Sequence, residues 1–198
     1  TVLRQRLPAL KKLKGVDLVI ANGENSADGN GVTPISADFL FSSGVDVITT
    51  GNHSFRRREI YPYYDDAPYI LRPANFPEKT TPGNGTLIYD MGRVQVCVIN
   101  LMGCVFLENL KDPYETIDEI LKKNTAKITI LDFHAEATAE KLAMGYYLDG
   151  RISAMFGTHT HVQTADECIF ENGMGYITDV GMTGPIKSVL GVKPELAI

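Results

Sequence analysis

Short apolar runs alternate with amphipathic segments along most of the chain. Leucines recur at spacings of four, three and three residues from Leu3 to Leu13, and this spacing predicts a helix over residues 1–14. Short apolar runs elsewhere predict buried strands. The expected strands cover residues 16–21, 45–50, 87–91, 94–101, 127–133, 152–156, 167–170 and 175–179, and the further helices cover residues 33–43, 57–63, 113–123 and 137–148.

This order of elements predicts the fold class. Strands alternate with helices, and a tight turn at Gly92 joins two strands into a hairpin, so we expect an α/β fold with a mixed sheet or two packed sheets. A length of 198 residues suits one well-buried domain, here residues 1–198. The chain begins inside a helical pattern without Met and stops at Ile198 without a terminating signal, so we expect further segments on both sides.

Composition excludes some classes of protein. Hydrophobic residues make up 44% and charged residues 22% of the chain, as in ordinary soluble proteins. A net charge of −5 argues against a non-specific nucleic-acid binder, but not against a small phosphorylated substrate held by metal ions. The three cysteines, Cys97, Cys104 and Cys168, show no C-x-x-C spacing, which indicates reduced thiols in a cytoplasmic protein. No apolar run reaches the ~18 residues of a membrane span.

Polar side chains able to bind metal follow four of the expected strands, and all four histidines of the chain are among them. Ligands of open α/β sheets bind beyond the carboxyl ends of the strands, so we expect these four loops to converge. In an extended segment, residues two apart point to the same side, which would direct both His159 and His161 into one pocket. The candidates are Glu24, Asn25, Asn52, His53, His134, His159 and His161.

This mixture of imidazole, carboxylate and amide groups indicates a particular chemistry. Structural zinc sites use four Cys or His ligands, whereas six or seven nitrogen and oxygen ligands suit two ions such as Mn or Fe, bridged by a carboxylate. Such a pair suits in-line attack of a metal-bound hydroxide on phosphorus, while a separate histidine protonates the leaving oxygen.

Plainer interpretations stay open for several of these residues. The histidines of residues 159–161 could be polar loop residues with nothing bound, Asn52 a turn residue, and His134 a semi-buried histidine with a protein partner. Asp132 and Glu136 flank His134 and could fix its tautomer, or could equally cap a helix or carry solvated charge.

Two further groups lie after the second polar loop. Residues 56–58 are three arginines that could steer a phosphate toward the site, although a solvated helix face is the favoured interpretation. Tyr61, Tyr63 and Tyr64 could stack a base, although packing is favoured.

Longer strings resemble a known family. Gly51-Asn52-His53, the isolated His134 and His159-Thr160-His161 are similar to the spaced signature of calcineurin-like metallophosphoesterases. Residues 21–25, 46–53, 71–75, 132–138, 157–166 and 178–185 resemble the bacterial YmdB-type subfamily, over nearly the whole chain. The resemblance implies a four-layer α/β/β/α sandwich, a di-metal site and phosphodiesterase activity on substrates such as 2′,3′-cyclic nucleotides.

The resemblance also implies roles for individual residues. Glu24 would be the bridging carboxylate and Asn25 a ligand beside it. His53 would be the general acid. The ligands completing one metal site would be Asn52, His134 and His159, and His161 would bind the other metal.

The chain departs from the family pattern in three places. The family's first strand, which carries an Asp ligand, is absent from this sequence, which begins in the helix that should follow that strand. The C-terminal strands of the family are also missing. Ser54 stands where the superfamily usually has Asp or Glu. Without that first Asp, the site of His161 loses a charged ligand, and weak occupancy and low activity would follow.

Three functions remain as hypotheses. The leading one is a cytoplasmic di-metal phosphodiesterase that uses Fe or Mn and acts on small phosphodiesters. A second is a non-enzymatic regulator of RNA metabolism that binds a protein or RNA partner on the same metal-stabilised fold. A third is a related enzyme of capsule-polymer synthesis. A homo-oligomer is left open.

Overall fold

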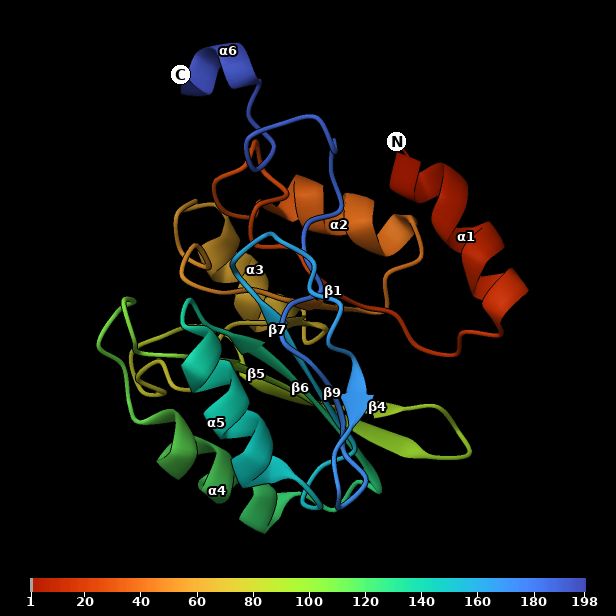
Figure 1. Cartoon of the computed structure of the whole chain (residues 1–198), viewed down its shortest axis with the longest axis vertical. Coiled ribbons are helices and arrows are strands. Elements are labelled where there is room, and N and C mark those ends of the chain that lie inside the picture. Colours follow the sequence, from red (N-terminus) through yellow and green to blue (C-terminus); the bar gives the residue numbers. More distant parts are fainter. Residues whose placement is uncertain (1) are drawn as a thin grey trace.

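A computed structural model describes residues 2–198, so Thr1 of the first expected helix lies outside the described residues. Two sheets form the framework (Figure 1). The first has the order β1-β2-β3 with all strands parallel, and the second has the order β4-β5-β6-β7-β9-β8. The strands are β1 (Ile20–Asn22), β2 (Val47–Thr49), β3 (Ile70–Leu71), β4 (Thr86–Asp90), β5 (Gln95–Met102), β6 (Ile128–His134), β7 (Ala154–Thr158), β8 (Cys168–Ile169) and β9 (Gly175–Ile177).

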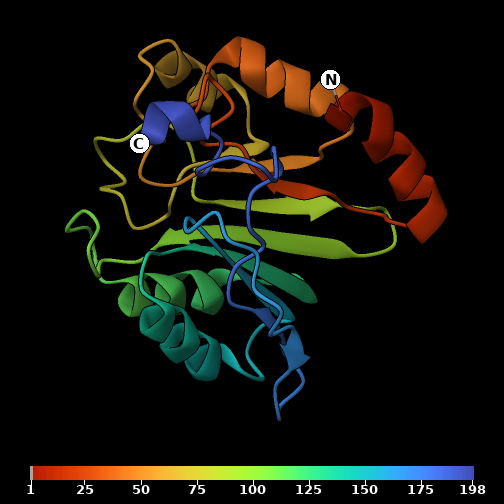
Figure 2. The same cartoon turned by 45° about the horizontal axis from the view of Figure 1, so that its top comes forward.

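Helices cover the outer face of each sheet, as Figure 2 shows. Helices α1 (Val2–Lys14), α2 (Pro34–Ser42) and α3 (Ile60–Asp66) cover the first sheet, whereas α4 (Pro113–Lys123) and α5 (Thr138–Leu148) cover the second. A short helix, α6 (Pro194–Ala197), ends the chain. The inner faces of the sheets pack on each other through a third apolar cluster that includes Val47, Leu71, Val96 and Val98. The expected four-layer α/β/β/α sandwich is therefore confirmed.

Local sequence explains the layers. Along β5, Val96 and Val98 face the other sheet, while Cys97, Ile99 and Leu101 pack beneath α4 and α5. Side chains alternate between the two faces of a strand, so a strand covered on both faces reads as one continuous apolar run. This run is the reason why the sequence predicts the central strands of the second sheet well.

The edges of the first sheet differ from the predictions. The first strand covers only Ile20–Asn22, and just before it the Val19 N–H donates to the Asp46 carboxylate, 2.8 Å away. The second strand is likewise shorter than residues 45–50. Neither β3 nor α6 was predicted, since β3 is a two-residue strand held by β2 in a Pro-rich segment and α6 has only four residues.

Two predicted elements lie later in the chain than expected. Helix α3 spans Ile60–Asp66, so residues 56–58 precede it and do not form a helix face, although Arg56 and Arg58 are exposed to solvent as expected. Strand β7 spans Ala154–Thr158, which carries the sheet up to the residue before His159.

Packing accounts for two aromatic residues that were candidates for stacking. Tyr64 is buried and its hydroxyl lies 3.0 Å from Thr50 Oγ1, while Tyr61 contacts Phe55 with ring centroids 5.1 Å apart. No helix within residues 2–198 is long and apolar enough to cross a membrane.

Candidate metal centre

The carboxyl ends of β1 and β2 meet those of β6 and β7 where the two sheets pack together. Glu24 follows β1, Asn52 follows β2, His134 ends β6 and His159 follows β7. Ligand atoms of Glu24, His134 and His159 all lie within 4.8 Å of one another. The expected convergence of the four loops is present.

Three groups surround one ring nitrogen at the middle of this cluster. His134 Nε2 lies 2.9 Å from Asn52 Oδ1, 3.1 Å from His159 Nδ1 and 3.2 Å from Glu24 Oε1. His134 and Glu24 are almost fully buried, with 1% and 2% of their side chains exposed. Burial by itself would raise the pKa of Glu24, but contacts that include the hydrogen bond from the backbone N–H of His53 lower it overall, which favours the ionised carboxylate.

Hydrogen bonds on the far side of the ring assign the His134 tautomer. The Thr158 hydroxyl donates to Asp132 Oδ1 at 2.7 Å, so its oxygen accepts the Nδ1–H of His134 at 2.9 Å. Asp132 is fully buried, which raises its pKa, and a hydrogen bond from Thr49 opposes that effect. This chain of contacts leaves the Nε2 lone pair of His134 facing the cluster.

His159 is oriented in the same way from outside. Its Nε2 lies 2.8 Å from Glu136 Oε2, so the proton sits on that side and the Nδ1 lone pair faces His134. Burial lowers the pKa of His159, which favours the neutral ring that a metal ion binds. Asp132 is joined to His134 by hydrogen bonds through Thr158. Glu136, which was expected to act on His134, contacts His159 instead.

The electrostatics of the cluster fit a cation. Two imidazole lone pairs, one carboxylate oxygen and one amide oxygen converge, and like partial charges at this separation repel unless a positive charge lies between them. Buried polar groups in native proteins have partners, so four converging acceptor atoms without shared protons form a candidate ligand set. The members of this set are Glu24, Asn52, His134 and His159.

The other three candidates form a second group beside the first. Asn25 Oδ1 lies 2.8 Å from His53 Nδ1, and Asn25 Nδ2 lies 3.3 Å from His161 Nε2. The backbone N–H of His53 donates to Glu24 Oε2 at 3.1 Å, which joins the two groups. His161 Nδ1 is buried and has no hydrogen-bond partner within residues 2–198.

The backbone conformation that directs His159 and His161 into the site was not predicted from the sequence. His159 has φ of 99° and His161 has φ of 65°, so this segment is not the extended strand that the spacing predicted. Each histidine therefore reaches the site from a left-handed backbone conformation, which costs free energy for residues other than glycine.

The turn after β2 is shaped to admit His134. A Cβ at Gly51 would lie closer than 3.0 Å to the His134 imidazole, a separation that real Cβ atoms essentially never show. Ser54 is buried and donates its hydroxyl to the Gly51 carbonyl oxygen, so the residue that departs from the superfamily pattern braces this turn. Arg57 donates to the carbonyl oxygens of Ala27 and Asn30, and so ties the turn to the loop that carries Glu24.

Sequence reasoning missed Thr158, which contacts His134, Asp179, which contacts Thr160, and Lys141, which contacts Asp179. Thr158 lies one residue beyond the predicted strand, and a lysine on a helix gives no sign that it is buried. The string containing Asp179 was noted only for its resemblance to the family.

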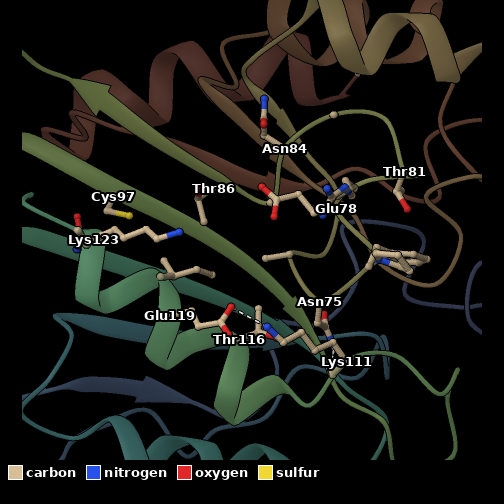
Figure 3. Close-up of a pocket in the computed structure, with 18 of the residues that line it drawn as sticks. Asn75, Glu78, Thr81, Asn84, Thr86, Cys97, Lys111, Thr116, Glu119 and Lys123 are labelled. Atoms are coloured by element: carbon tan, nitrogen blue, oxygen red, sulfur yellow. Dashed lines mark hydrogen bonds and ion pairs between the residues drawn. The ribbon is translucent and has the colours of Figure 1, made fainter.

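A cavity lies away from these residues. It has a volume of about 770 Å³ and lies between α4, strands β4 and β5, and the loop before β4. Lys111 and Glu119 form an ion pair of 2.6 Å on its wall (Figure 3). None of the candidate ligands lines it.

A two-sheet sandwich with Glu, Asn and His side chains at adjoining strand ends defines a metallophosphoesterase, an enzyme that hydrolyses phosphate esters with the help of metal ions. A family model described as YmdB-like protein matches residues 1–198, and the chain belongs to that family.

Its relatives include characterised and structurally solved proteins. The chain is 48% identical over 200 residues to the 2′,3′-cyclic-nucleotide 2′-phosphodiesterase of Bacillus subtilis, a match that covers all of this chain and 75% of the relative. A crystal structure of a hypothetical protein from Thermus thermophilus superposes with a TM-score of 0.93 and 40% identity, over 98% of this chain and 75% of that one. A Mycoplasma pneumoniae protein described as a novel phosphatase gives a TM-score of 0.92 and 34% identity, over 99% and 72% of the two chains.

Proposed function

We propose that this protein is a phosphodiesterase that hydrolyses small phosphodiesters, with 2′,3′-cyclic nucleotides as the substrate class. The name of the Bacillus subtilis relative supports the substrate class, since the match runs the full length of this chain. The observation that carries the metal dependence is the convergence of Glu24, Asn52 and His159 on the Nε2 of His134.

Two ions, Fe or Mn, are the proposed cofactors. Oxygen and imidazole ligands without thiolate suit these metals better than they suit structural zinc. Asn52, His134 and His159 would hold one ion and His161 the other, with Glu24 shared and Asn25 beside it. When bound, the ions neutralise phosphate oxygens and lower the pKa of the attacking water. His161 lies beside Asn25, with 3.3 Å between its Nε2 and the Asn25 amide nitrogen, which supports placing both residues at the second ion.

His53 is the proposed general acid. Its Nδ1 contacts Asn25 Oδ1 at 2.8 Å, so the amide oxygen accepts the Nδ1 proton and orients the ring. In the doubly protonated ring, the opposite nitrogen, Nε2, carries the proton that goes to the leaving oxygen, and the ring is left neutral with its proton on Nδ1. The N–H of the same residue donates to Glu24 at 3.1 Å, so the acid and the shared carboxylate are positioned together.

Turnover of bis(p-nitrophenyl) phosphate and of 2′,3′-cyclic AMP, with Mn²⁺ or Fe²⁺ added, tests this proposal. His53→Ala should lower kcat by about 10²- to 10⁴-fold while the bound metal per chain stays unchanged. Asn52→Ala should weaken metal binding as well as turnover. Asn172→Ala is the matched control, because that amide contacts Asp149 away from the site.

Two results would refute the assignment. The first is no turnover by the unaltered protein with either metal, and the second is full turnover by the His53 variant. The regulatory partner, the homo-oligomer and the cytoplasmic location stay predictions.

A further inference from the structure

The turn that carries both metal-binding histidines is held in a conformation that its own residues disfavour. His159 and His161, on either side of Thr160, have positive φ angles of 99° and 65°. Neither residue is glycine, so contacts outside the turn must stabilise this backbone. A relaxed turn would withdraw His159 Nδ1 from its position 3.1 Å from His134 Nε2.

The contacts that hold the turn come from Asp179, two residues after β9. Its Oδ2 accepts the Thr160 N–H at 3.2 Å and the Thr160 hydroxyl at 2.8 Å. Its Oδ1 accepts the Gly181 N–H at 2.8 Å. The backbone of Asp179 also makes two hydrogen bonds with Thr164. The Thr164 N–H donates to the Asp179 carbonyl oxygen at 3.0 Å, and the Asp179 N–H donates to the Thr164 hydroxyl oxygen at 3.0 Å. One aspartate thus binds the turn at its centre and at its exit.

A buried lysine completes the arrangement. Lys141 on α5 is fully buried, and its ammonium donates to Asp179 Oδ2 at 2.7 Å. Within residues 2–198 its ammonium has no other hydrogen-bond acceptor. Burial alone would raise the pKa of Asp179, but the hydrogen bonds from Lys141 and Thr160 lower it, so the carboxylate stays ionised.

This ion pair is unusual because burying two charges costs more free energy than burying apolar side chains of the same volume. A purely structural role would be served as well by an apolar contact between α5 and β9. The ionised carboxylate provides something that an apolar residue cannot, namely an acceptor strong enough to take two hydrogen bonds from Thr160 at once.

We propose that Lys141 and Asp179 are positioning residues that fix the His159–His161 turn and thereby set the affinity of the protein for its metal ions. This inference rests on the proposed function, since it takes His159 and His161 as ligands. Neither residue belongs to the candidate ligand set. Lys141 orients Asp179, and Asp179 holds Thr160 so that the imidazoles on either side of it enter the site.

Thr160 offers the cleanest test, because its substitution leaves the ion pair intact. Thr160→Val removes the hydroxyl that donates to Asp179 and keeps the side-chain volume. Binding of Mn²⁺ to the metal-free protein, followed by isothermal titration calorimetry, should weaken by about tenfold, within the range seen when supporting partners of metal ligands are changed. Thr160→Ser restores the hydroxyl and should bind Mn²⁺ within about twofold of the unaltered protein.

Lys141→Met provides a stronger perturbation, and Lys11→Met is its matched control. Lys11 forms an ion pair of 2.8 Å with Asp46 between α1 and the first sheet, away from the candidate ligands. Hydrogen exchange of the metal-free proteins should speed up over residues 157–164 in the Lys141 variant and stay unchanged there in the Lys11 variant. Mn²⁺ affinity should fall in the Lys141 variant alone.

The outcomes separate this inference from the proposed function. If the unaltered protein binds Mn²⁺ and the Thr160→Val and Lys141→Met variants bind it equally well, the positioning role is overturned and the proposed function stands. Unchanged hydrogen exchange over residues 157–164 in the Lys141 variant would overturn the positioning role too. Unaltered protein that binds no metal would overturn the proposed function, and the positioning role with it.

Discussion

Gly51→Ala tests the geometry of the metal centre by adding a single methyl group. The φ angle of Gly51 is outside the left-handed region, so alanine meets no backbone strain there. The new Cβ would instead lie closer than 3.0 Å to the His134 imidazole, whereas ordinary van der Waals contact begins at 3.4 Å. The ring or the turn must therefore move, by an amount on the order of 1 Å for carbon atoms in such close contact.

The magnitude follows from how tightly the ring is held. His134 is buried and is fixed at Nδ1 by Thr158, 2.9 Å away, so it has little room to retreat. Forcing an extra methyl group into a packed site costs about 1–3 kcal/mol of stability. A displacement of about 1 Å in a catalytic constellation lowers the rate by about 10²-fold, and we expect kcat of the Gly51 variant to fall by about that factor.

Mn²⁺ titration calorimetry and phosphodiester turnover measure the effect, and urea unfolding measures the loss of stability. Gly175→Ala is the matched control, because its Cβ would meet only Ala154 and Ser153 at ordinary distances of 3.7 and 3.8 Å. A Gly51 variant with the metal affinity and kcat of the unaltered protein would refute the placement of His134 beside this turn.

Two further predictions concern a supporting hydroxyl and a surface ion pair. Thr158→Val removes the acceptor that fixes the His134 tautomer, so Mn²⁺ affinity, measured by calorimetry, should fall about 10- to 100-fold. Thr129→Val changes a buried threonine away from the site and should leave Mn²⁺ affinity unchanged. Equal Mn²⁺ affinity in the two variants would contradict the tautomer assignment. A hydrogen bond from Arg151 lowers the pKa of Asp118 in the folded protein, so this pair stabilises the fold above the unfolded-state pKa of about 3.9 and loses that effect as pH falls through the lower folded-state pKa. The difference in Tm between the unaltered protein and Asp118→Asn should therefore shrink below about pH 4, and a difference that is constant from pH 3 to 6 would argue against it.

The order of elements and the convergence of the loops followed from the sequence alone. Apolar runs such as residues 94–101 mark strands that are covered on both faces, and polar residues directly after such strands lie at a common edge. The prediction that Glu24, Asn52, His134 and His159 meet therefore needed only the pattern and the parallel arrangement of strands. The resemblance to the family supplied the four layers, which the pattern left as a choice between a mixed sheet and two packed sheets.

The tertiary structure alone decided how these side chains are presented. The orientation of the His134 ring depends on Thr158, which comes from the neighbouring strand, and the turn at His159 depends on Asp179 and Lys141 from two other elements. Hydrophobic periodicity is a local signal, since it reports which face of an element is buried and not which polar group lies opposite. No such local signal reports the hydrogen bonds between elements far apart in the sequence, or the positive φ angles that these bonds impose. The sequence therefore determined which residues meet, and the fold determined which atoms face one another.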